Sequence, residues 1–459
     1  MKSTIKLIRL SRLVTLAMVL MLVAVSLGGG TQVATAAHQN MPPTGLVCTT
    51  NVSDTFTLTT RDGYITEPDG NVVYMWGYSE AGEPFQHPSP VLCVDEGDAV
   101  TIVLNNTLGE DVSIIFPGQE NVMANGVPSQ PVFNDTEELV SLAPVAAAFG
   151  GSVTYSFTAT RPGTFIYQSG TEPAKQINMG LFGVIVVRPA ANVYDVDGNL
   201  VEAYAYNDPD TRYEPSAEYL LLISEIDPML HVAVEQGYLY NMNNYTPRYW
   251  NYNGRSFPDT IADNGADWLP DQPYGSLIYI REFDDQPTVT DEFGEVIDNP
   301  NYYPYPALNR IVNVGTMDYS HHPHGNHGRL IAWDGYLLKS GADEDMSSEE
   351  FTVTIGPGQT LDTLFKWEDK ENWHPVDNPI PVVIPQLQDL VVGPFYSGSP
   401  YLGNLENLPV GTQGLNQCGE YYHIAHNHAL HQITAWGVVL SGHITFARID
   451  PPLPNECTP

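Results

Sequence analysis

The chain has 459 residues, of which 54 are Asp or Glu and only 18 are Lys or Arg, and its net charge is −36. This balance excludes binding to a nucleic-acid backbone as the main activity, because neutralising phosphates takes clustered Lys and Arg. Hydrophobic residues make up 42% of the chain and charged residues 16%, which is the opposite of a disordered composition. We therefore expect a folded protein with two or three domains.

The N-terminus has the order of segments that is typical of a secretory signal peptide. Four bases lie within the first twelve residues, an apolar run extends from Leu13 to Leu27, and small residues follow at 34–37. The apolar run is shorter than the roughly 20 residues that a membrane-spanning helix needs. We therefore expect residues 1–37 to be a signal peptide that is cleaved near Ala37, and the mature protein to be secreted or otherwise extracytoplasmic.

The four cysteines can form two disulfide bonds in an oxidising compartment. They are Cys48, Cys93, Cys418 and Cys457, and three pairings are open. We expect Cys48–Cys93 and Cys418–Cys457, so that each bond closes one half of the chain. The spacing does not match a CxxC redox or zinc site, so we expect no catalytic cysteine.

Short β-branched runs separated by turn residues dominate the sequence. The chain has 39 Gly and 37 Pro, and few stretches have the period of a helix. This pattern predicts an all-β fold made of sandwich or barrel domains. Examples of the expected strands are residues 55–59, 100–104, 153–157 and 183–187.

The chain divides into two halves that repeat the same order of features. A turn-rich segment precedes a strand in each half, and each half ends on a strand near aromatic residues. We predict an N-terminal domain over residues 43–190, a linker over 191–216 and a C-terminal domain over 217–452. The second domain is longer, and it carries expected surface loops near residues 238–253, 284–298 and 374–417.

Histidines cluster in the second half. Two windows hold nine of the 13 histidines, and each window contains one His-x-His pair. Residues two apart on a β-strand point to the same face, so two such pairs on neighbouring strands would converge on one site. Neutral imidazoles suit copper, zinc, iron or nickel. We therefore predict a metal site with the ligands His322, His324, His426 and His428.

We do not assign the other histidines of these windows as metal ligands. A lone residue such as His327 or His431 is more often hydrogen-bonded than metal-bound, so we assign neither as a ligand. His443 stands outside both pairs, and we expect it to support the ligands from behind.

Several blocks occur in a particular order along the chain: residues 163–170, Gln176 and 180–183 in the first half, then 253–258, 322–325 and Gly335 in the second. Together these blocks resemble the multicopper oxidases, which are built from cupredoxin domains. The likeness covers about residues 44–451. It implies two cupredoxin-like Greek-key β-sandwiches, copper as the cofactor, and oxidation of a reducing substrate coupled to the reduction of oxygen.

The resemblance carries over only half of the family's trinuclear copper ligands. That centre takes four His-x-His pairs, two from each of two domains, and the second-half pairs of this chain match two of them. The first-half pairs are absent. Ile115-Phe116-Pro117-Gly118 and Gln168-Ser169-Gly170 stand in their places.

The family's type 1 copper site is also incomplete. Its cysteine lies between the histidines of the last pair, where this chain has Asn427, and one of its histidines lies where this chain has Tyr319. A second register that starts at His423 puts Ile424 in the cysteine position. Neither register supplies the sulfur ligand of a blue copper site. We therefore expect no intact laccase-type electron path, and we assign no catalytic residue.

Three interpretations follow from this site. The first is a secreted copper-binding protein that acts as a copper-dependent oxidoreductase on an unidentified reductant. The second is a non-catalytic metal-binding or envelope structural protein, with zinc or another transition metal as an alternative to copper. The third is a scaffold whose histidines hydrogen-bond one another. Within an oligomer, only a different protein could supply the missing histidines, because every copy of this chain lacks them.

Overall fold

Strands with one buried face build the first half of the chain. The computed structural model describes residues 41–291, 293–368, 421–450 and 452–453. Every second residue of β4 (Ala99–Asn105) and β9 (Ser152–Thr158) is buried, as their alternating sequences predict. These strands are central in a six-stranded sheet, whose spatial order is β2 (Val72–Glu80), β1 (Thr55–Thr66), β4, β9, β5 (Met123–Ala124) and β6 (Val127–Pro128).

A three-stranded sheet packs on this one. Its order is β10 (Gly163–Gln168), β11 (Phe182–Arg188) and β3 (Val91–Asp95). One hydrophobic core contains side chains of both sheets, among them Ile102 and Ile185, so this half is a β-sandwich. The same half also contains β7 (Val132–Phe133), β8 (Leu139–Ser141) and helix α2 (Pro173–Gln176).

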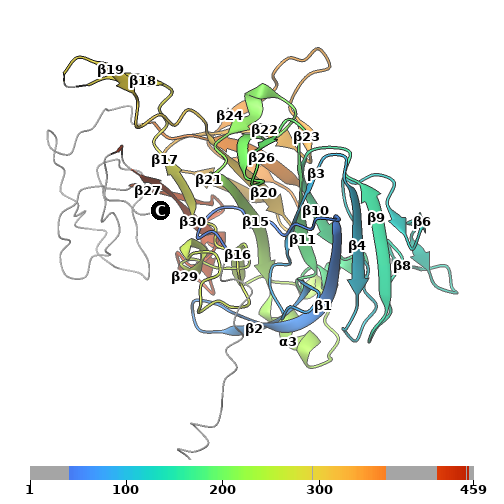
Figure 1. The fold of residues 1–459 in the computed structure, drawn as a ribbon. Coiled ribbons are helices and arrows are strands. Elements are labelled where there is room, and N and C mark those ends of the chain that lie inside the picture. Colours follow the sequence, from blue (N-terminus) through green and yellow to red (C-terminus); the bar gives the residue numbers. More distant parts are fainter. Residues whose placement is uncertain (1–40, 292, 369–420, 451, 454–459) are drawn as a thin grey trace, which may run out of the picture. The chain divides into compact units, whose positions relative to one another are not determined.

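The second half is a larger β-sandwich (Figure 1). Ile223, Tyr319 and Val353 come from its two sheets and pack in one core. One sheet has the order β16 (Tyr249–Tyr252), β15 (Glu218–Ile226), β20 (Ala307–Asn313), β26 (Thr360–Phe365), β22 (Gly328–Trp333) and β23 (Tyr336–Leu337), with β24 (Ser348–Glu350) paired to β22. The other has the order β17 (Ile278–Arg281), β30 (Ile444–Asp450), β27 (Tyr421–Asn427), β21 (Tyr319–Pro323) and β25 (Val353–Ile355).

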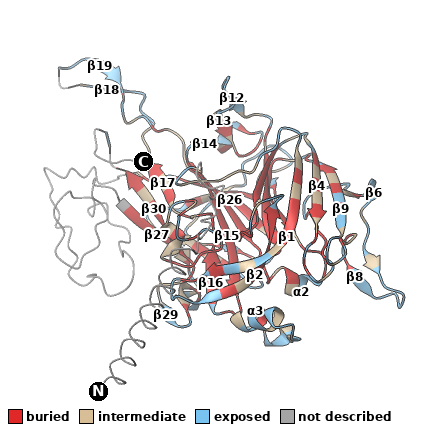
Figure 2. Cartoon of the chain, turned by 60° about the horizontal axis from the view of Figure 1, so that its bottom comes forward, coloured by how far each residue is buried: buried red, intermediate tan, exposed pale blue. Residues whose placement is uncertain are grey.

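Strand β15 is buried along its whole length (Figure 2), because it has a hydrophobic core on each face. Leu221 and Ile223 pack inside the second sandwich. Leu220 and Leu222 point the other way and pack in a cluster with Val184 of β11. The two sandwiches therefore share a hydrophobic interface.

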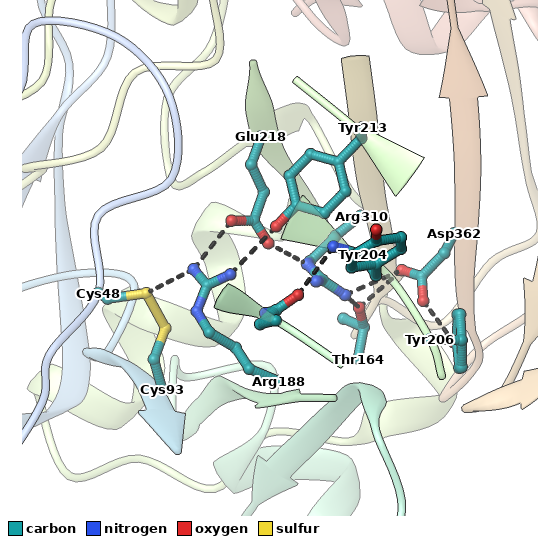
Figure 3. Close-up of polar contacts among 11 residues, drawn as sticks. Cys48, Cys93, Thr164, Arg188, Tyr204, Tyr206, Tyr213, Glu218, Arg310 and Asp362 are labelled. Carbon is teal, nitrogen blue, oxygen red and sulfur yellow. Dashed lines mark hydrogen bonds and ion pairs between the residues drawn. A yellow bond between two sulfur atoms is a disulfide. The ribbon is translucent and has the colours of Figure 1, made fainter. Parts of the chain in front are cut away.

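A chain of buried charged groups crosses this interface (Figure 3). Glu218 accepts hydrogen bonds from Arg188 Nη2 (2.8 Å) and Arg310 Nε (2.7 Å). Arg188 ends β11 of the first sandwich, whereas Arg310 lies in β20 of the second. Burial alone would raise the pKa of Glu218, but the two guanidinium groups lower it to about 2. Arg310 also donates to Thr164 Oγ1 (2.9 Å), which donates to Asp362 (2.6 Å).

A disulfide bond joins Cys48 to Cys93, which is one of the two predicted pairs. It lies at the edge of the charged network, since Arg188 Nη2 is 3.5 Å from Cys48 Sγ (Figure 3). Cys418 and Cys457 lie outside the described residues, so the second bond stays a prediction.

The segments between the sandwiches contain structure of their own. The predicted linker, residues 191–216, forms a small sheet of β12 (Val193–Tyr194), β13 (Leu200–Tyr204) and β14 (Arg212–Tyr213), with the 3-10 helix η1 (Pro209–Thr211). In the acidic loop, β18 (Thr288–Thr290) and β19 (Val296–Asp298) form a hairpin that extends away from the other strands (Figure 1). The predicted domain boundaries, residues 43–190 and 217–452, stay a prediction.

The other two expected loops have different outcomes. Residues 249–252 were expected in a surface loop, which is wrong, because they form the fully buried strand β16 next to β15. Most of the loop expected at 374–417 lies outside the described residues.

Short helices cap the strand framework. Helix α3 (Pro228–Glu235) begins after Asp227, whose side chain accepts a hydrogen bond from Met229 N (2.9 Å). Within the described ranges, no helix is long and apolar enough to cross a membrane. The all-β fold class is confirmed. The remaining elements are η2 (Met242–Asn244), η3 (Asp259–Ile261), η5 (Leu430–Ile433), β28 (Thr434–Ala435) and β29 (Val438–Val439).

Candidate metal centre

Two neighbouring strands bring the His-x-His pairs side by side. β21 and β27 pair antiparallel in a register that sets His322 opposite His426. His324 and His428 follow directly after these strands, and their backbone amides continue the pairing. His324 N donates to Ile424 O (2.8 Å), and His428 N donates to Ser320 O (2.7 Å). Because side chains alternate along a strand, all four imidazoles emerge on the same face of the sheet.

Three of these imidazoles converge closely. One ring nitrogen from each of His322, His324 and His426 lies within 4.8 Å of the other two. The closest pair is Nε2 of His324 and Nε2 of His426, at 3.2 Å. All three residues are half-buried. A single ion could therefore reach all three nitrogens with small adjustments of the rings.

Neighbouring carbonyl groups set the free nitrogen of two of these rings. His322 Nδ1 lies 2.5 Å from Phe351 O, and His426 Nδ1 lies 2.8 Å from Asn427 O. A carbonyl oxygen can only accept, so each Nδ1 carries the hydrogen and donates it. The hydrogen-free nitrogen of each ring is then Nε2, as in metal-binding histidines, and that of His426 faces His324 Nε2 at 3.2 Å.

The surroundings lower the pKa of two rings of the cluster. Burial, together with the imidazoles of His426, His322 and His428, lowers the pKa of His324 to about 4. The pKa of His426 is also lowered, mainly by burial. A neutral imidazole is the form that binds a metal, so the ring of His324 is ready for a ligand role near neutral pH.

The fourth predicted ligand, His428, lies at the rim. Its ring centre is 4.8 Å from that of His322 and 5.6 Å from that of His426, on which it stacks. It is exposed, and its nitrogens lie outside the group of three. The four rings therefore lie together, but only three of them bring a nitrogen into the close group. Metal binding by all four residues stays a prediction.

Comparison with known proteins shows similarity to multicopper oxidases in the first half of the chain. Residues 65–192 match the family described as "Multicopper oxidase". A stretch of 106 residues is 34% identical to multicopper oxidase VdtB of Byssochlamys spectabilis, covering 22% of this chain and 13% of that protein. Another match, of 128 residues, is 36% identical to the iron transport multicopper oxidase FET3 of Gibberella zeae, covering 27% and 19%. The chain therefore spans less than a fifth of each of these curated relatives.

The structural comparison covers more of the chain. The blue copper oxidase from Nitrosomonas europaea superposes with a TM-score of 0.52 at 16% sequence identity, over 86% of this chain and 85% of that chain. A likeness of this kind shows the fold, which is that of cupredoxin-like β-sandwiches. By sequence, residues 65–192 are similar to multicopper oxidases.

In this chain, the position of the type 1 cysteine has a structural role. Asn427 Oδ1 accepts hydrogen bonds from Ser320 N (3.3 Å) and Ala429 N (3.0 Å), and Nδ2 donates to Gln432 Oε1. Both cysteines that the structure describes are in the disulfide bond, so neither offers a thiolate. The side-chain amide of Asn427 thus connects the ends of β21 and β27 from which the predicted ligands extend.

The position of the type 1 histidine is likewise occupied by a buried polar contact. Tyr319 is 1% exposed and donates a hydrogen bond to Glu225. Glu225 also accepts from Thr316 N (2.6 Å). Burial raises the pKa of Glu225. These groups satisfy one another, and they present no copper ligand.

Three further histidines lie on the opposite face of β21, β27 and β30, and all of them are buried: His321, His423 and His443. His443 Nε2 donates to Ser224 O (3.0 Å), and its ring stacks on Tyr252 at 4.9 Å. His443 contacts Asn427 rather than a predicted ligand. Of these three, only His443 was expected to have a role, that of supporting the ligands, and alternation along the strand from His322 would have separated His321 from the outer four.

The first-half counterpart of the cluster contains hydroxyl groups. Ile115 and Gln168 pair through their backbones at 2.8 and 3.1 Å, so the two segments meet as the resemblance implies. Next to them, the buried hydroxyls of Ser113, Ser141 and Thr171 lie 2.9 to 3.0 Å from one another. They form a closed hydrogen-bonded group.

Gly170 stands where the resemblance expects a histidine. A Cβ atom there would lie 2.8 Å from Ile115 Cγ2 and 3.0 Å from Ser113 Oγ. Real Cβ atoms essentially never approach so closely, so even a methyl group would force its neighbours to shift. The absence of first-half ligands is therefore built into the packing.

The donor set of the second half fits copper without a type 1 centre. Three neutral imidazole nitrogens suit Cu or Zn, and a blue copper site needs a thiolate that this site lacks. The predicted ligands converge from two strands held in one register. Nitrogen ligands placed in this way can bind one metal ion together.

Proposed function

We propose that this chain is an extracytoplasmic copper-binding protein and a copper-dependent oxidoreductase. In this proposal His322, His324 and His426 hold the ion, and His428 lies at its open side. The observation that carries the proposal is the convergence of three imidazole nitrogens within 4.8 Å. Similarity of part of the chain to multicopper oxidases supports copper as the cofactor.

Each residue around the ion has a defined part in this proposal. The carbonyl groups of Phe351 and Asn427 hold the Nδ1 hydrogens and so aim the Nε2 lone pairs of His322 and His426. Copper held there would supply one-electron oxidation and reduction. The exposed rim at His428 leaves a side from which a small reductant can approach.

A second candidate is metal sequestration without catalysis. It is favoured by Asn427, whose hydrogen bonds occupy the position of the cysteine through which electrons enter in the family. The hydrogen-bonded hydroxyls of the first half favour it as well, because within the described residues they stand where a second set of ligands would complete a cluster.

Metal analysis of matched variants tests the site. We expect the protein to bind copper after reconstitution, with an electron paramagnetic resonance spectrum of nitrogen ligation and no intense blue absorption. The double variant His324→Ala/His426→Ala should lose at least about 100-fold in affinity, more than the 10–100-fold typical of residues that only support ligands. His327→Ala is the matched control, because His327 is an exposed histidine of the same loop. Equal copper binding by the double variant would place the site elsewhere.

Oxygen consumption separates the two candidates. With ascorbate as a one-electron reductant, an oxidoreductase consumes oxygen in proportion to bound copper, and the double variant does not. A sequestering protein binds the same copper and leaves the rate at that of the control without protein.

The location is tested by the N-terminus of the exported protein. We expect sequencing of mature protein from the culture medium or the cell envelope to begin near residue 38. Recovery of an intact N-terminus from the cytosol would contradict the signal-peptide part of the proposal.

A further inference from the structure

A cavity of about 630 Å³ lies next to the histidine cluster. Two short chain segments connect them. Asn326 and His327, which line the cavity, directly follow the ligand loop at His324. Glu349 also lines it, and two residues later the ring of Phe351 lies 5.9 Å from that of His322 and 6.4 Å from that of His327.

The cavity has the size and walls of a small-molecule site. Such sites commonly measure 300–1,000 Å³ and combine apolar walls with a few polar groups. Here the apolar wall consists of Phe283, Pro304, Pro306 and Leu364. A compound with a single aromatic ring fits a space of this volume.

The charges of the cavity differ from those of the chain. Across the whole chain, acids outnumber bases by 54 to 18. The cavity is lined by three of each, which are Arg212, Arg329 and Lys366 against Asp210, Glu349 and Glu368. An anion that the rest of this surface would repel therefore meets no net negative charge here.

Arg212 is the base whose donors are left for a ligand. Its guanidinium group stacks on the ring of Tyr305 at 4.1 Å. The nearest carboxylate, that of Glu202, is 3.8 Å away, and the Arg212 side chain makes no hydrogen bond within the part of the chain that the structure describes. By contrast, Arg329 donates to Ser347 and to Asp345, both at 2.8 Å.

The contact with Tyr305 holds the guanidinium group over the ring face. The edge of a guanidinium group matches a carboxylate through two parallel hydrogen bonds. Lys366 is less suited, since its ammonium group already pairs with Glu368 at 2.6 Å. The carboxylate receptor of this cavity is therefore Arg212.

We propose that the cavity binds a small aromatic monocarboxylate, with its carboxylate on Arg212 and its ring against Phe283 and Leu364. A ligand with a second carboxylate would meet Asp210, Glu349 and Glu368 and is disfavoured. This site goes beyond the proposed copper function, and its occupation does not require a metal.

Calorimetric titration of the full chain without added metal tests the site. The probe is benzoate, compared with benzyl alcohol, which lacks the charge, and with terephthalate, which has a second one. We expect benzoate to bind, and both comparison compounds to bind at least about tenfold more weakly, because a hydrogen bond to a charged group contributes enough for a change of that size. Equal binding of benzyl alcohol would overturn the role of Arg212.

Variants locate the binding. Arg212→Gln should weaken benzoate binding at least about tenfold, and Arg212→Lys, which keeps the charge but loses the planar fork, should fall between it and the wild type. Arg248→Gln is the matched control, since Arg248 also lies over an aromatic ring, that of Trp436, and does not line the cavity. Unchanged binding in Arg212→Gln or in Arg212→Lys would overturn the proposal. Because these titrations are performed without added metal, their outcome does not depend on whether the protein binds copper.

Discussion

The first and second halves of the chain place two segments side by side at corresponding positions, but they leave different groups free. In the first half Ile115 pairs with Gln168, and nearby hydroxyls donate to one another. In the second half His322 pairs with His426, and each ring has one nitrogen bound to a carbonyl and one lone pair left over. The strands of the two halves pair alike, so the ability to bind a ligand depends on the nitrogen lone pairs that only the second half leaves available.

The two regions also differ in the space that they allow. Gly170 has its neighbours within 3.2 Å of where a Cβ would lie. The imidazole cluster instead has a half-buried and partly exposed rim at His324 and His428. The first half therefore has neither the histidines nor the space for them at Gly170, and the following experiments act on that contrast.

Acid should produce the largest effect, and it should act first on the second half. Burial lowers the pKa of six histidines to about 3 or 4, so they stay neutral in the folded state while the unfolded chain takes up protons below about pH 6.5. Each of the five buried histidines then removes up to about 1.4 kcal/mol of unfolding free energy per pH unit between pH 6.5 and about 4. The half-buried His324 removes less, because solvent screens its charge. The six are His87, His231, His321, His324, His423 and His443.

Four of these six lie on or beside β21, β27 and β30, so hydrogen exchange at pH 5 should rise there before it rises in β4 and β9. Glu67 acts in the opposite direction. Burial raises its pKa to about 7, so its contribution is present at low pH and is lost as the pH rises through 7. Denaturant titrations at pH 7.5, 6 and 5 measure the net slope. Earlier exchange in the first sandwich would contradict the contrast.

Restoring histidines to the first half should fail. The double variant Gln168→His/Gly170→His should lose about 3 kcal/mol of unfolding free energy, because a large polar ring enters a closed space. Its copper stoichiometry should equal that of the wild type. Additional bound copper at unchanged stability would show that the packing around Gly170 can open. Urea unfolding and metal analysis of the same samples decide this.

Removing the amide at 427 should affect stability more than copper. Asn427→Ala leaves Ala429 N and Gln432 without their partner, at a cost of about 2 kcal/mol. The carbonyl that orients His426 belongs to the backbone and remains, so the copper affinity should change by less than about threefold. Asn427→Asp is the control that keeps the accepting oxygen. A large loss of copper with unchanged stability would assign Asn427 to the metal.

The smallest effect is expected at the rim. His428→Ala should weaken copper binding by less than about tenfold, because its nitrogens lie outside the close group, whereas His324→Ala should weaken it by more than about 100-fold. Competition with a chelator of known affinity measures both. Equal losses would mean that the ion lies nearer to His428 than the apposed nitrogens of His324 and His426 indicate.

Much of the fold, and the meeting of the four predicted ligands, follow from strand periodicity. The alternation in residues 100–104 and 153–157 predicts β4 and β9, and the spacing of two in each His-x-His pair predicts one shared face. Register is set by long-range pairing, so the sequence could not show that His428 lies at the rim. It also could not show that Tyr249 to Tyr252 form a buried strand, because that strand is defined by its contact with β15.

Other features depend on segments that are distant in the sequence. The cavity at Arg212 takes its lining from six separate places between residues 210 and 368, and no local motif joins them. The closed hydroxyl group of Ser113, Ser141 and Thr171 has the same origin. Substituted ligand positions can be recognised in a sequence, but what fills the space around them is decided by packing.

The double-sided burial of β15 limits how the molecule can be divided. Separating the halves would uncover Leu220 and Leu222 and would leave Glu218 without Arg188. A fragment that contains only the histidine sandwich would thus expose a hydrophobic surface with an unpaired charge. We expect such a fragment to self-associate. We expect heat or denaturant to melt the two halves in one step at neutral pH, so a thermogram of the intact chain should show a single peak.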